Sequence, residues 1–260
     1  MSEPRLDVSR PGPAARDRSP WWGVHASRYG FAGPYVADRS VLDIACGTGY
    51  GMAILRARAR TVVGVDADLA AVRAAARVEA GGPALVADGT RLPFADGAFG
   101  AVTSFETLEH LGDRERFLSE LRRVLRPGGI CVLSTPNANY TEPIDGRPRN
   151  PFHVHEYTPG ELAAALGRQF ASVEMLGQEL DARFAISPFR DDQQKLPRAA
   201  SVQMKLFLWR VLNRLPHAVS EPVARLALGQ PLVPRVRDYR FSPANIANAP
   251  VLVAICRTAS

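Results

Sequence analysis

The chain has 260 residues, with 32 Lys and Arg residues against 26 Asp and Glu residues and a formal net charge of +6. This length accommodates one large domain, or a core domain that carries a substantial insertion. Hydrophobic residues make up 46% of the chain and charged residues 22%, a composition that is typical of globular proteins and excludes global disorder. The basic balance permits a nucleic-acid partner, but net charge alone does not say where the charge lies.

Three cysteines, Cys46, Cys131 and Cys256, are too few and too scattered for a disulfide framework or a zinc site. Each lies in an apolar, strand-like run, which predicts buried side chains in a reducing compartment. Residues 1–20 are rich in Pro, Arg, Gly and Ser, lack the apolar segment of a signal peptide, and are predicted to form a flexible tail. No stretch reaches the ~20 apolar residues of a membrane span, so we expect a cytoplasmic protein.

Short apolar runs alternate with helical patterns in the first half of the chain. The expected strands are the five runs at 40–45, 61–66, 84–87, 101–105 and 130–134. A helix follows the first strand near Met52, and Asp68 and Asp113 are expected to cap two more. The helix after Asp113 is predicted to end at the Pro-Gly-Gly segment that begins at Pro127. This alternation predicts an α/β fold with a parallel sheet covered on both faces.

The second half adds further helices and two strands, expected at 172–177 and 250–256. Thr158 and Glu161 predict a helix that begins with a capping box. The interval 178–249 is far longer than a hairpin loop, and such intervals usually hold structure of their own. One helix in it is indicated by apolar residues at helical spacing, namely Val202, Leu206, Trp209, Leu212 and Leu215. A second is expected from Ser220 to Leu228, ended by Gly229. We interpret the interval as a helical insertion over the sheet edge.

A glycine-rich loop, DIACGTGYG at 43–51, follows the first predicted strand. Gly47 and Gly49 would let the backbone approach a ligand, and the helix that follows would present free amide groups. Dinucleotide-binding proteins use a similar loop, but their pattern has a third glycine where this chain has Met52. Asp43 lies four residues before Gly47, where it could receive a cationic group of a ligand rather than a pyrophosphate.

Two further carboxylates lie at the predicted carboxyl edge of the sheet, where ligands bind in such folds. Asp66 ends the second strand, about 20 residues after the glycine loop, where a carboxylate can accept hydrogen bonds from ribose hydroxyls. Asp88 follows the third strand, where it can accept a hydrogen bond from an exocyclic amine. The alternative for each is a solvated or capping carboxylate, and Asp68 is assigned to its helix cap.

Five longer segments complete a pattern: VLDIACGTGYG, VVGVDAD, VADGTRLPFADGAFGAVTSFETLEHL, RRVLRPGGICVLSTPN and NPFHVHEYTPGEL. Together they resemble the class I S-adenosylmethionine-dependent methyltransferases, over residues 21–177 and the last strand. The resemblance implies a Rossmann-like, doubly wound sheet of seven strands whose last strand is antiparallel. It also implies S-adenosylmethionine as the cofactor, an enzyme of the EC 2.1.1 type, and a cofactor-binding core formed by 21–177 and 250–260.

The resemblance also implies roles for individual residues. Asp43 would lie near the methionine ammonium, Asp66 near the ribose and Asp88 near the adenine amine. The His-x-x-Arg-Tyr segment at 25–29 resembles one found in the subgroup that carries Phe-His-x-x-Glu, and it would close over the methionine end. In full, the predicted cofactor-binding residues are His25, Tyr29, Asp43, Gly47, Gly49, Asp66, Ala67, Asp88, Gly89 and Phe105.

Methyl transfer from a sulfonium is an in-line displacement, for which the protein aligns the nucleophile, excludes water and, for an aliphatic hydroxyl, supplies a base. His110 and His153 follow the fourth and fifth strands and are the predicted bases, because imidazole accepts a proton near neutral pH. His155 is a weaker candidate, and each histidine also has a structural interpretation. His153, His155 and Glu156 could hold a metal, but three donors within four residues are a thin ligand set, so we expect no metal.

We therefore predict a methyltransferase that acts on a small-molecule acceptor, with a hydroxyl of a sugar or secondary metabolite preferred. The alternatives are an N-methyltransferase of small amines, an NAD(P)-dependent oxidoreductase, a nucleic-acid methyltransferase and a catalytically silent binding module. Met52, Asp43 and the missing second nucleotide-binding half count against the oxidoreductase. The chain shows neither an RNA-binding module nor the Asn/Asp-Pro-Pro-aromatic motif of base methylases, so nucleic acid is disfavoured as a partner. Homodimer formation is left open.

The positive charge is concentrated in one part of the chain. The segment 41–177 carries 14 basic and 16 acidic residues, whereas 178–249 carries 11 basic and 6 acidic residues. A basic insertion, with Arg210 and Arg214 one turn apart, predicts a substrate lid for an acceptor that bears a phosphate or carboxylate. A merely solvated basic face is the alternative. In either case the net charge does not indicate nucleic-acid binding.

Overall fold

The computed structural model describes residues 20–187 and 196–260, so the predicted flexible tail lies outside the described residues except for its last position. The chain divides into two compact units. The first contains Arg28–Glu179 and Phe241–Ser260, and the second contains 20–27 and Leu180–Arg240. None of the helices in the described part of the chain is long and apolar enough to cross a membrane.

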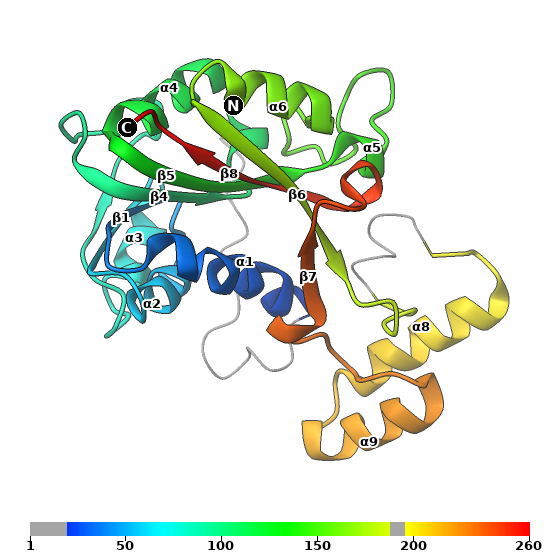
Figure 1. The fold of residues 1–260 in the computed structure, drawn as a ribbon. Helices are drawn as coiled ribbons and strands as arrows, with labels where there is room; N and C mark the ends of the chain where they lie inside the picture. The colour runs from blue at the N-terminus through cyan, green and yellow to red at the C-terminus, as the bar shows by residue number, and fades with distance from the viewer. Residues whose placement is uncertain (1–19, 188–195) are drawn as a thin grey trace. The chain divides into compact units, whose positions relative to one another are not determined.

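The strands form one eight-stranded sheet in the order β3-β2-β1-β4-β5-β8-β6-β7 (Figure 1). Their bounds are β1 Ser40–Ile44, β2 Thr61–Asp66, β3 Ala84–Val86, β4 Phe99–Phe105, β5 Leu125–Pro136, β6 Ser172–Leu180, β7 Tyr239–Ser242 and β8 Val251–Arg257. The strands β1 to β5 pair in parallel, whereas β8 pairs antiparallel with both β5 and β6. The predicted α/β class and the antiparallel last strand are confirmed, but the predicted number of seven strands is wrong.

The additional strand is β7, which lies within the interval 178–249 that the sequence predicts to be helical. It has four residues, Tyr-Arg-Phe-Ser, of which only Tyr239 is buried. An edge strand is paired on one side only and can be short and polar. A run of this length and composition does not stand out by its apolar pattern, which is why the sequence did not indicate it.

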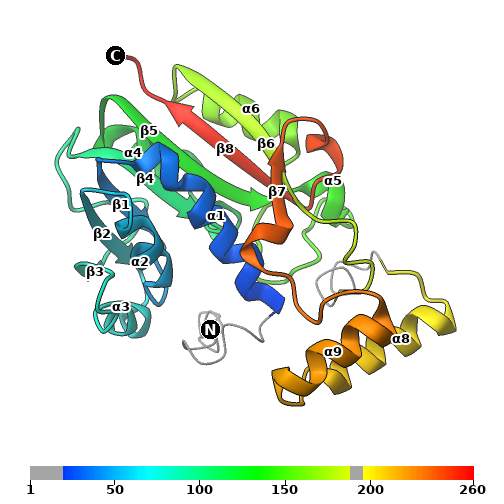
Figure 2. The ribbon, with the colours of Figure 1, turned by 60° about the horizontal axis from the view of Figure 1, so that its bottom comes forward.

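Helices cover both faces of the sheet. The helices of the described residues are α1 Pro20–Val36, α2 Tyr50–Arg56, α3 Leu69–Ala75, α4 Arg114–Val124, α5 Ala138–Thr141, α6 Pro159–Gly167, α8 Ala200–Leu212 and α9 His217–Leu228, of which α8 and α9 belong to the second unit. Within the first unit, α2 and α3 lie on one face and α4 and α6 on the other (Figure 2). This is the doubly wound arrangement expected from alternating strands and helices, and it leaves the carboxyl ends of the strands open to a ligand.

Side-chain caps fix the beginnings of three helices as the sequence predicts. Asp68 and Asp113 accept backbone N–H groups of α3 and α4, at 2.8 and 3.0 Å. Thr158 and Glu161 form the reciprocal capping box of α6. Each cap satisfies amide groups that have no partner within the helix, so short-range sequence rules suffice to place these helix starts.

Two helix ends differ from the prediction. The helix α4 ends at Val124, before the Pro-Gly-Gly segment, because Leu125 already pairs with the start of β4. The helix α9 begins at His217 rather than Ser220, since backbone N–H groups of its first turn already bond to the carbonyl of Pro216. In both cases backbone hydrogen bonds decide where the helix ends or begins, and the pattern of side chains in the sequence does not reveal these bonds.

Separate apolar cores stabilise the two units. The core of the first unit includes Cys131 and Cys256, and Cys46 is buried as well, so the predicted burial of the three thiols is confirmed. In the second unit α8 packs on α9 through Trp209, Leu212, Ala224 and Leu228. The indole N–H of Trp209 also donates a hydrogen bond to the carbonyl of Leu232.

Candidate functional site

The loop between β1 and α2 has a tight backbone that requires glycine. Gly47 and Gly49 have left-handed φ angles of 55° and 79°. A Cβ at Gly49 would lie 2.8 Å from the Cα of Ala75, and one at Gly51 would lie 2.0 Å from the ring of Tyr29. An L side chain at Gly49 or Gly51 would therefore force its neighbours apart. Because these glycines have no side chain, the backbone of the loop can lie close to the end of β1.

Asp43 is fully buried near the end of β1. Its Oδ1 accepts a hydrogen bond from Thr103 at 2.7 Å, and its Oδ2 accepts one from the Tyr29 hydroxyl at 3.3 Å. Burial raises the pKa of Asp43 to about 7, because the hydrogen bonds from Thr103 and Tyr29 offset only part of the desolvation and nearby Asp66 adds to it. A cationic group placed beside this carboxyl would restore its charge, as the predicted contact with an ammonium requires.

Asp66, at the end of β2, is held by backbone amides. Its Oδ2 accepts the N–H of Gly47 at 2.8 Å and its Oδ1 accepts the N–H of Asp68 at 2.9 Å. Asp88 is exposed two residues after β3, and its Oδ1 accepts two hydrogen bonds from Thr90. The carboxylates thus have fixed orientations. Each oxygen of Asp66 keeps a further lone pair for a ligand, and in Asp88 it is Oδ2 that can accept from one.

The remaining predicted cofactor residues belong partly to the first unit and partly to the second. Phe105 ends β4 and meets the ring of Tyr29 edge-on, with 4.8 Å between centroids. Ala67 is exposed directly after β2, and Gly89 is half-buried after β3. His25 lies in the part of α1 that belongs to the second unit, so its contact with the cofactor stays a prediction. The described geometry brings Tyr29 together with Asp43 and Phe105.

A second cluster forms after β4, around the 3₁₀ turn η2 Leu108–His110. Glu109 is fully buried, and its Oε2 accepts a hydrogen bond from Thr135 at 3.0 Å. Its Oε1 has no hydrogen-bond partner among the residues that the structure describes. Burial raises the pKa of Glu109 well above its usual range, and neighbouring Glu106 raises it further. The backbone carbonyl of Glu109 accepts the N–H of Val154 at 2.7 Å, which ties the loop between α5 and α6 to this turn.

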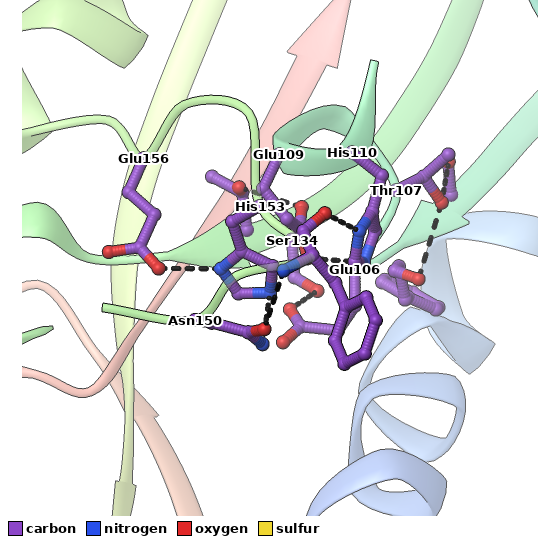
Figure 3. Close-up of polar contacts among 12 residues, drawn as sticks. Glu106, Thr107, Glu109, His110, Ser134, Asn150, His153 and Glu156 are labelled. Atoms are coloured by element: carbon purple, nitrogen blue, oxygen red, sulfur yellow. Dashed lines mark hydrogen bonds and ion pairs between the residues drawn. The ribbon is translucent and has the colours of Figure 1, made fainter. Parts of the chain in front are cut away.

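His110 and His153 meet in this cluster, with ring centroids 4.9 Å apart and an angle of 82° between the rings (Figure 3). The Nδ1 of His110 lies 2.9 Å from the carbonyl oxygen of Phe152. The Nδ1 of His153 lies 2.5 Å from Oε1 of Glu156, and its Nε2 lies 2.9 Å from the amide nitrogen of Asn150. The structure thus brings together the two histidines that the sequence proposes for catalysis, from turns that lie 43 positions apart.

These contacts define which ring nitrogens carry hydrogen. A carbonyl oxygen only accepts, so Nδ1 of His110 is the donor to Phe152. The Oδ1 of Asn150 accepts the backbone N–H of Phe152, so its Nδ2 donates to Nε2 of His153. The Nδ1 of His153 then donates to Glu156. His153 therefore carries its lone pair on Nε2, where it accepts from Asn150. His110 in its neutral form has its lone pair on Nε2 as well, and a lone pair there accepts a proton or a metal ion.

Glu156 is buried behind the His153 ring. Burial by itself would raise the pKa of Glu156, but hydrogen bonds from His153 and Thr141 outweigh it and hold this pKa below its usual value. His155 points elsewhere and packs edge-on against Tyr157, at 4.5 Å between centroids, and burial lowers its pKa. The combination of His153, His155 and Glu156 considered as a metal site is therefore not assembled.

Sequence reasoning missed several members of this cluster. Glu109 was visible only as the neighbour of His110, and its burial depends on β5. Thr135 and Asn150 have ordinary sequence contexts. Thr135 contributes because β4 pairs with β5, which sets it beside the turn that carries Glu109. Asn150 contributes because it lies in the same loop as His153 and contacts its ring. A carboxylate next to a histidine after a predicted strand was the one signal that could have indicated this residue.

The fold and the site define a Rossmann-like enzyme with two halves at one sheet edge. The glycine loop and the carboxylates at the carboxyl ends of β1, β2 and β3 (Asp43, Asp66 and Asp88) form what we call the cofactor half. Glu109, His110 and His153, which follow β4 and β5, form what we call the acceptor half.

Comparison with known proteins identifies the family. A family model described as "Methyltransferase domain" matches residues 42–133. A relative in Mycolicibacterium smegmatis, named a "probable S-adenosylmethionine-dependent methyltransferase", is 37% identical over 189 residues, which are 68% of this chain and 72% of the relative. A relative of the same description in Mycobacterium tuberculosis H37Rv is 36% identical over 174 residues, 63% of this chain and 62% of its own length.

Solved structures agree on the fold. The crystal structure of a SAM-dependent methyltransferase from Archaeoglobus fulgidus matches with a TM-score of 0.57 at 20% identity, covering 92% of this chain and 95% of that one. The chain belongs to the S-adenosylmethionine-dependent methyltransferases, and S-adenosylmethionine is its cofactor.

Proposed function

We propose that the protein methylates a hydroxyl group of a small-molecule acceptor, such as a sugar or a secondary metabolite. The observation that carries this proposal is the hydrogen bond of His153 to buried Glu156, at 2.5 Å. An aliphatic hydroxyl needs a base before it attacks a methyl group, and a carboxylate-supported imidazole is such a base. A neutral amine has its own lone pair and needs no base, so this arrangement favours an oxygen acceptor over a nitrogen acceptor.

The residues of the cofactor half fit S-adenosylmethionine. The buried carboxyl of Asp43, whose pKa is about 7, calls for a positive charge, which a methionine ammonium supplies. The amides and carboxylates around Asp66 suit ribose hydroxyls. We assign cofactor binding to His25, Tyr29, Asp43, Gly47, Gly49, Asp66, Ala67, Asp88, Gly89 and Phe105.

When bound, S-adenosylmethionine supplies an electrophilic methyl group, and its sulfur keeps the electron pair of the C–S bond that breaks. We assign catalysis to His110 and His153. The Nε2 of His153 accepts the proton of the acceptor hydroxyl, and Glu156 stabilises the imidazolium that results. The ring centroid of His110 lies 4.9 Å from that of His153, and His110 positions the acceptor oxygen beside Nε2 of His153.

The helices α8 and α9 complete the proposed architecture. In it, 21–177 and 250–260 are the cofactor-binding core, and 178–249 is a lid for the substrate. The lid carries 11 basic and 6 acidic residues, and Arg210 and Arg214 are exposed on or beside α8. These guanidinium groups suit an acceptor that bears a phosphate or a carboxylate. The protein would act in the cytoplasm.

The proposal is tested by a screen of hydroxylated metabolites, with and without acidic groups, incubated with S-adenosylmethionine and read by mass spectrometry. We expect an O-methylated product, and we expect its formation to depend on His153. Methylation of amines alone, or full turnover in both His110→Ala and His153→Ala, would overturn the assignment of a hydroxyl acceptor.

A further inference from the structure

Three potential metal ligands converge in the acceptor half. Glu109, His110 and His153 each offer one ligand atom, and these atoms all lie within 4.8 Å of one another (Figure 3). Glu109 and His110 belong to the turn η2, and His153 comes from the loop between α5 and α6. The turn and the loop are tied together by the hydrogen bond from the Val154 amide to the Glu109 carbonyl. The cluster is therefore held by backbone contacts as well as by its own side chains.

The carboxylate of Glu109 lacks a partner for one of its two oxygens within the described part of the chain. Its residue is fully buried, and its Oε1 has no hydrogen-bond donor within the described part of the chain. This oxygen lies 3.8 Å from Nε2 of His110, while Thr135 holds the other oxygen. A buried carboxylate oxygen without a donor costs free energy, so such atoms are rarely left unmatched. A cation between Oε1 and the histidine nitrogens would supply the missing partner.

The histidines are oriented as metal ligands usually are. A metal-bound imidazole typically donates its second N–H to a carboxylate or a backbone carbonyl, which fixes its tautomer. His110 makes this contact with the carbonyl of Phe152, and His153 makes it with Glu156, at 2.9 and 2.5 Å. In its neutral form each ring thus has its lone pair on Nε2, the nitrogen away from these partners, and that of His153 accepts from Asn150.

We propose that Glu109, His110 and His153 bind a divalent first-row transition metal ion, through Oε1 of the carboxylate and Nε2 of each imidazole. Two imidazoles and one carboxylate form a common ligand set of catalytic metal sites, with open positions left for a substrate. Ligands ~2.1 Å from one ion are about 3–3.5 Å apart, so the cluster contracts on binding. Nε2 of His153 accepts from Asn150, whose exposed side chain would turn away into solvent when the ion binds.

This inference rests on the proposed function and deepens it. An acceptor hydroxyl bound to the ion ionises at a lower pH than a free hydroxyl. Its proton passes to solvent, its oxygen forms the new C–O bond, and the sulfonium sulfur keeps the electrons of the broken bond. With the ion present, His153 is a ligand of the metal rather than the base, and Glu156 supports it in that role.

The test begins with direct metal binding. Tag-free, full-length protein is treated with a chelator, dialysed and titrated with Co²⁺, and the visible ligand-field absorption is recorded. We expect about one ion per chain, and we expect Glu156→Gln to weaken binding about 10- to 100-fold by removing the support of His153. Loss of a direct ligand, in Glu109→Gln or His153→Ala, should weaken it at least as much. The matched control is His155→Ala, in the same loop, which should bind Co²⁺ as the unaltered protein does.

Further readouts separate the outcomes. S-adenosylmethionine binding and circular dichroism show which variants remain folded, and partly exposed His153 provides a variant if Glu109→Gln does not fold. The absence of saturable Co²⁺ binding, or equal affinity in His153→Ala and His155→Ala, would overturn the site. Hydroxyl methylation that is unchanged by the chelator would overturn the catalytic role of the ion and leave His153 as the base. Failure of the proposed function looks different: Co²⁺ binds normally, but no hydroxyl is methylated with or without the ion.

Discussion

The two halves of the sheet edge are built in different ways. In the cofactor half, the carboxylate of Asp66 is satisfied by backbone amides of its own and the neighbouring loop, at 2.8 and 2.9 Å. In the acceptor half, Glu109 is buried with one oxygen lacking a donor among the described residues, and its neighbour His153 comes from a separate loop. The hydrogen bonds of Asp66 are thus complete without a ligand, and in this half it is the charge of Asp43 that calls for one. In the acceptor half, a buried carboxylate oxygen still needs a partner that a ligand can supply. We expect substitutions to separate cofactor binding from methyl transfer.

The largest effect should come from the acceptor half. We expect His153→Ala to lower kcat about 10²- to 10³-fold. The variant lacks the imidazole that acts on the acceptor hydroxyl, either as its base or as a ligand of the metal ion. Affinity for S-adenosylmethionine, measured by calorimetry, should stay within about twofold. His155→Ala is the control and should retain its kcat. A parallel loss of cofactor affinity in His153→Ala would mean that the two halves are not separate.

The next largest effect concerns Asp43. We expect Asp43→Asn to weaken S-adenosylmethionine binding about 10- to 100-fold, since the amide keeps the shape but not the charge that a bound ammonium requires. The pKa of Asp43 in the ligand-free protein is about 7. The ionised form binds the cation, so affinity should fall about tenfold per pH unit below that pKa and level off above it. In the Asn variant this pH dependence should disappear; its persistence would assign the charge contact to another group.

The same pKa has a consequence for stability. Asp43 holds its proton more tightly in the folded protein than in the unfolded chain, whose pKa is near 3.8. Its contribution to stability is therefore fully present below about pH 4 and is lost as the pH rises through about 7. The melting temperature of the ligand-free protein should fall over this window relative to that of Asp43→Asn. Parallel melting curves of the two proteins across the window would contradict the assigned pKa.

A smaller effect is expected in the glycine loop. Gly49→Ala forces a Cβ into a left-handed backbone and to 2.8 Å from the Cα of Ala75, so we expect a loss of about 1–2 kcal/mol of unfolding free energy. Chemical denaturation measures this loss. Gly160→Ala, at a position where a Cβ meets nothing within 4 Å, is the matched control. Equal stability of the two variants would show that the loop tolerates a side chain.

The smallest effect is expected in the proposed lid. Neutralising Arg210 and Arg214 together should raise the KM for an acidic acceptor a few-fold at low salt, and the difference should shrink as salt screens the charges. The KM for a neutral acceptor serves as the control. An unchanged KM for both acceptors would make these arginines ordinary solvated residues and would remove the support for an acidic acceptor.

The same contrast explains what the sequence could predict. The glycine loop, Asp66 and the caps at Asp68 and Asp113 follow short-range rules, so their residue types and spacing are informative. The acceptor half depends on which loops the sheet brings together. His110 and His153 could be named from their positions after strands, but the burial of Glu109 could not. Likewise β7 has no apolar pattern in its sequence. It is a strand because it lies beside β6 at the edge of the sheet, and its composition does not indicate this.

The central claim is that the acceptor half directs a methyl group to oxygen. The most direct measurement uses S-adenosylmethionine with a ¹³C-labelled methyl group, an acceptor found in the metabolite screen, and the carbon chemical shift of the methylated product. The account predicts a methyl signal in the range of O-methyl ethers, formed by the unaltered protein and nearly lost in His153→Ala. A labelled methyl group on nitrogen, or equal O-methylation by both proteins, would contradict it.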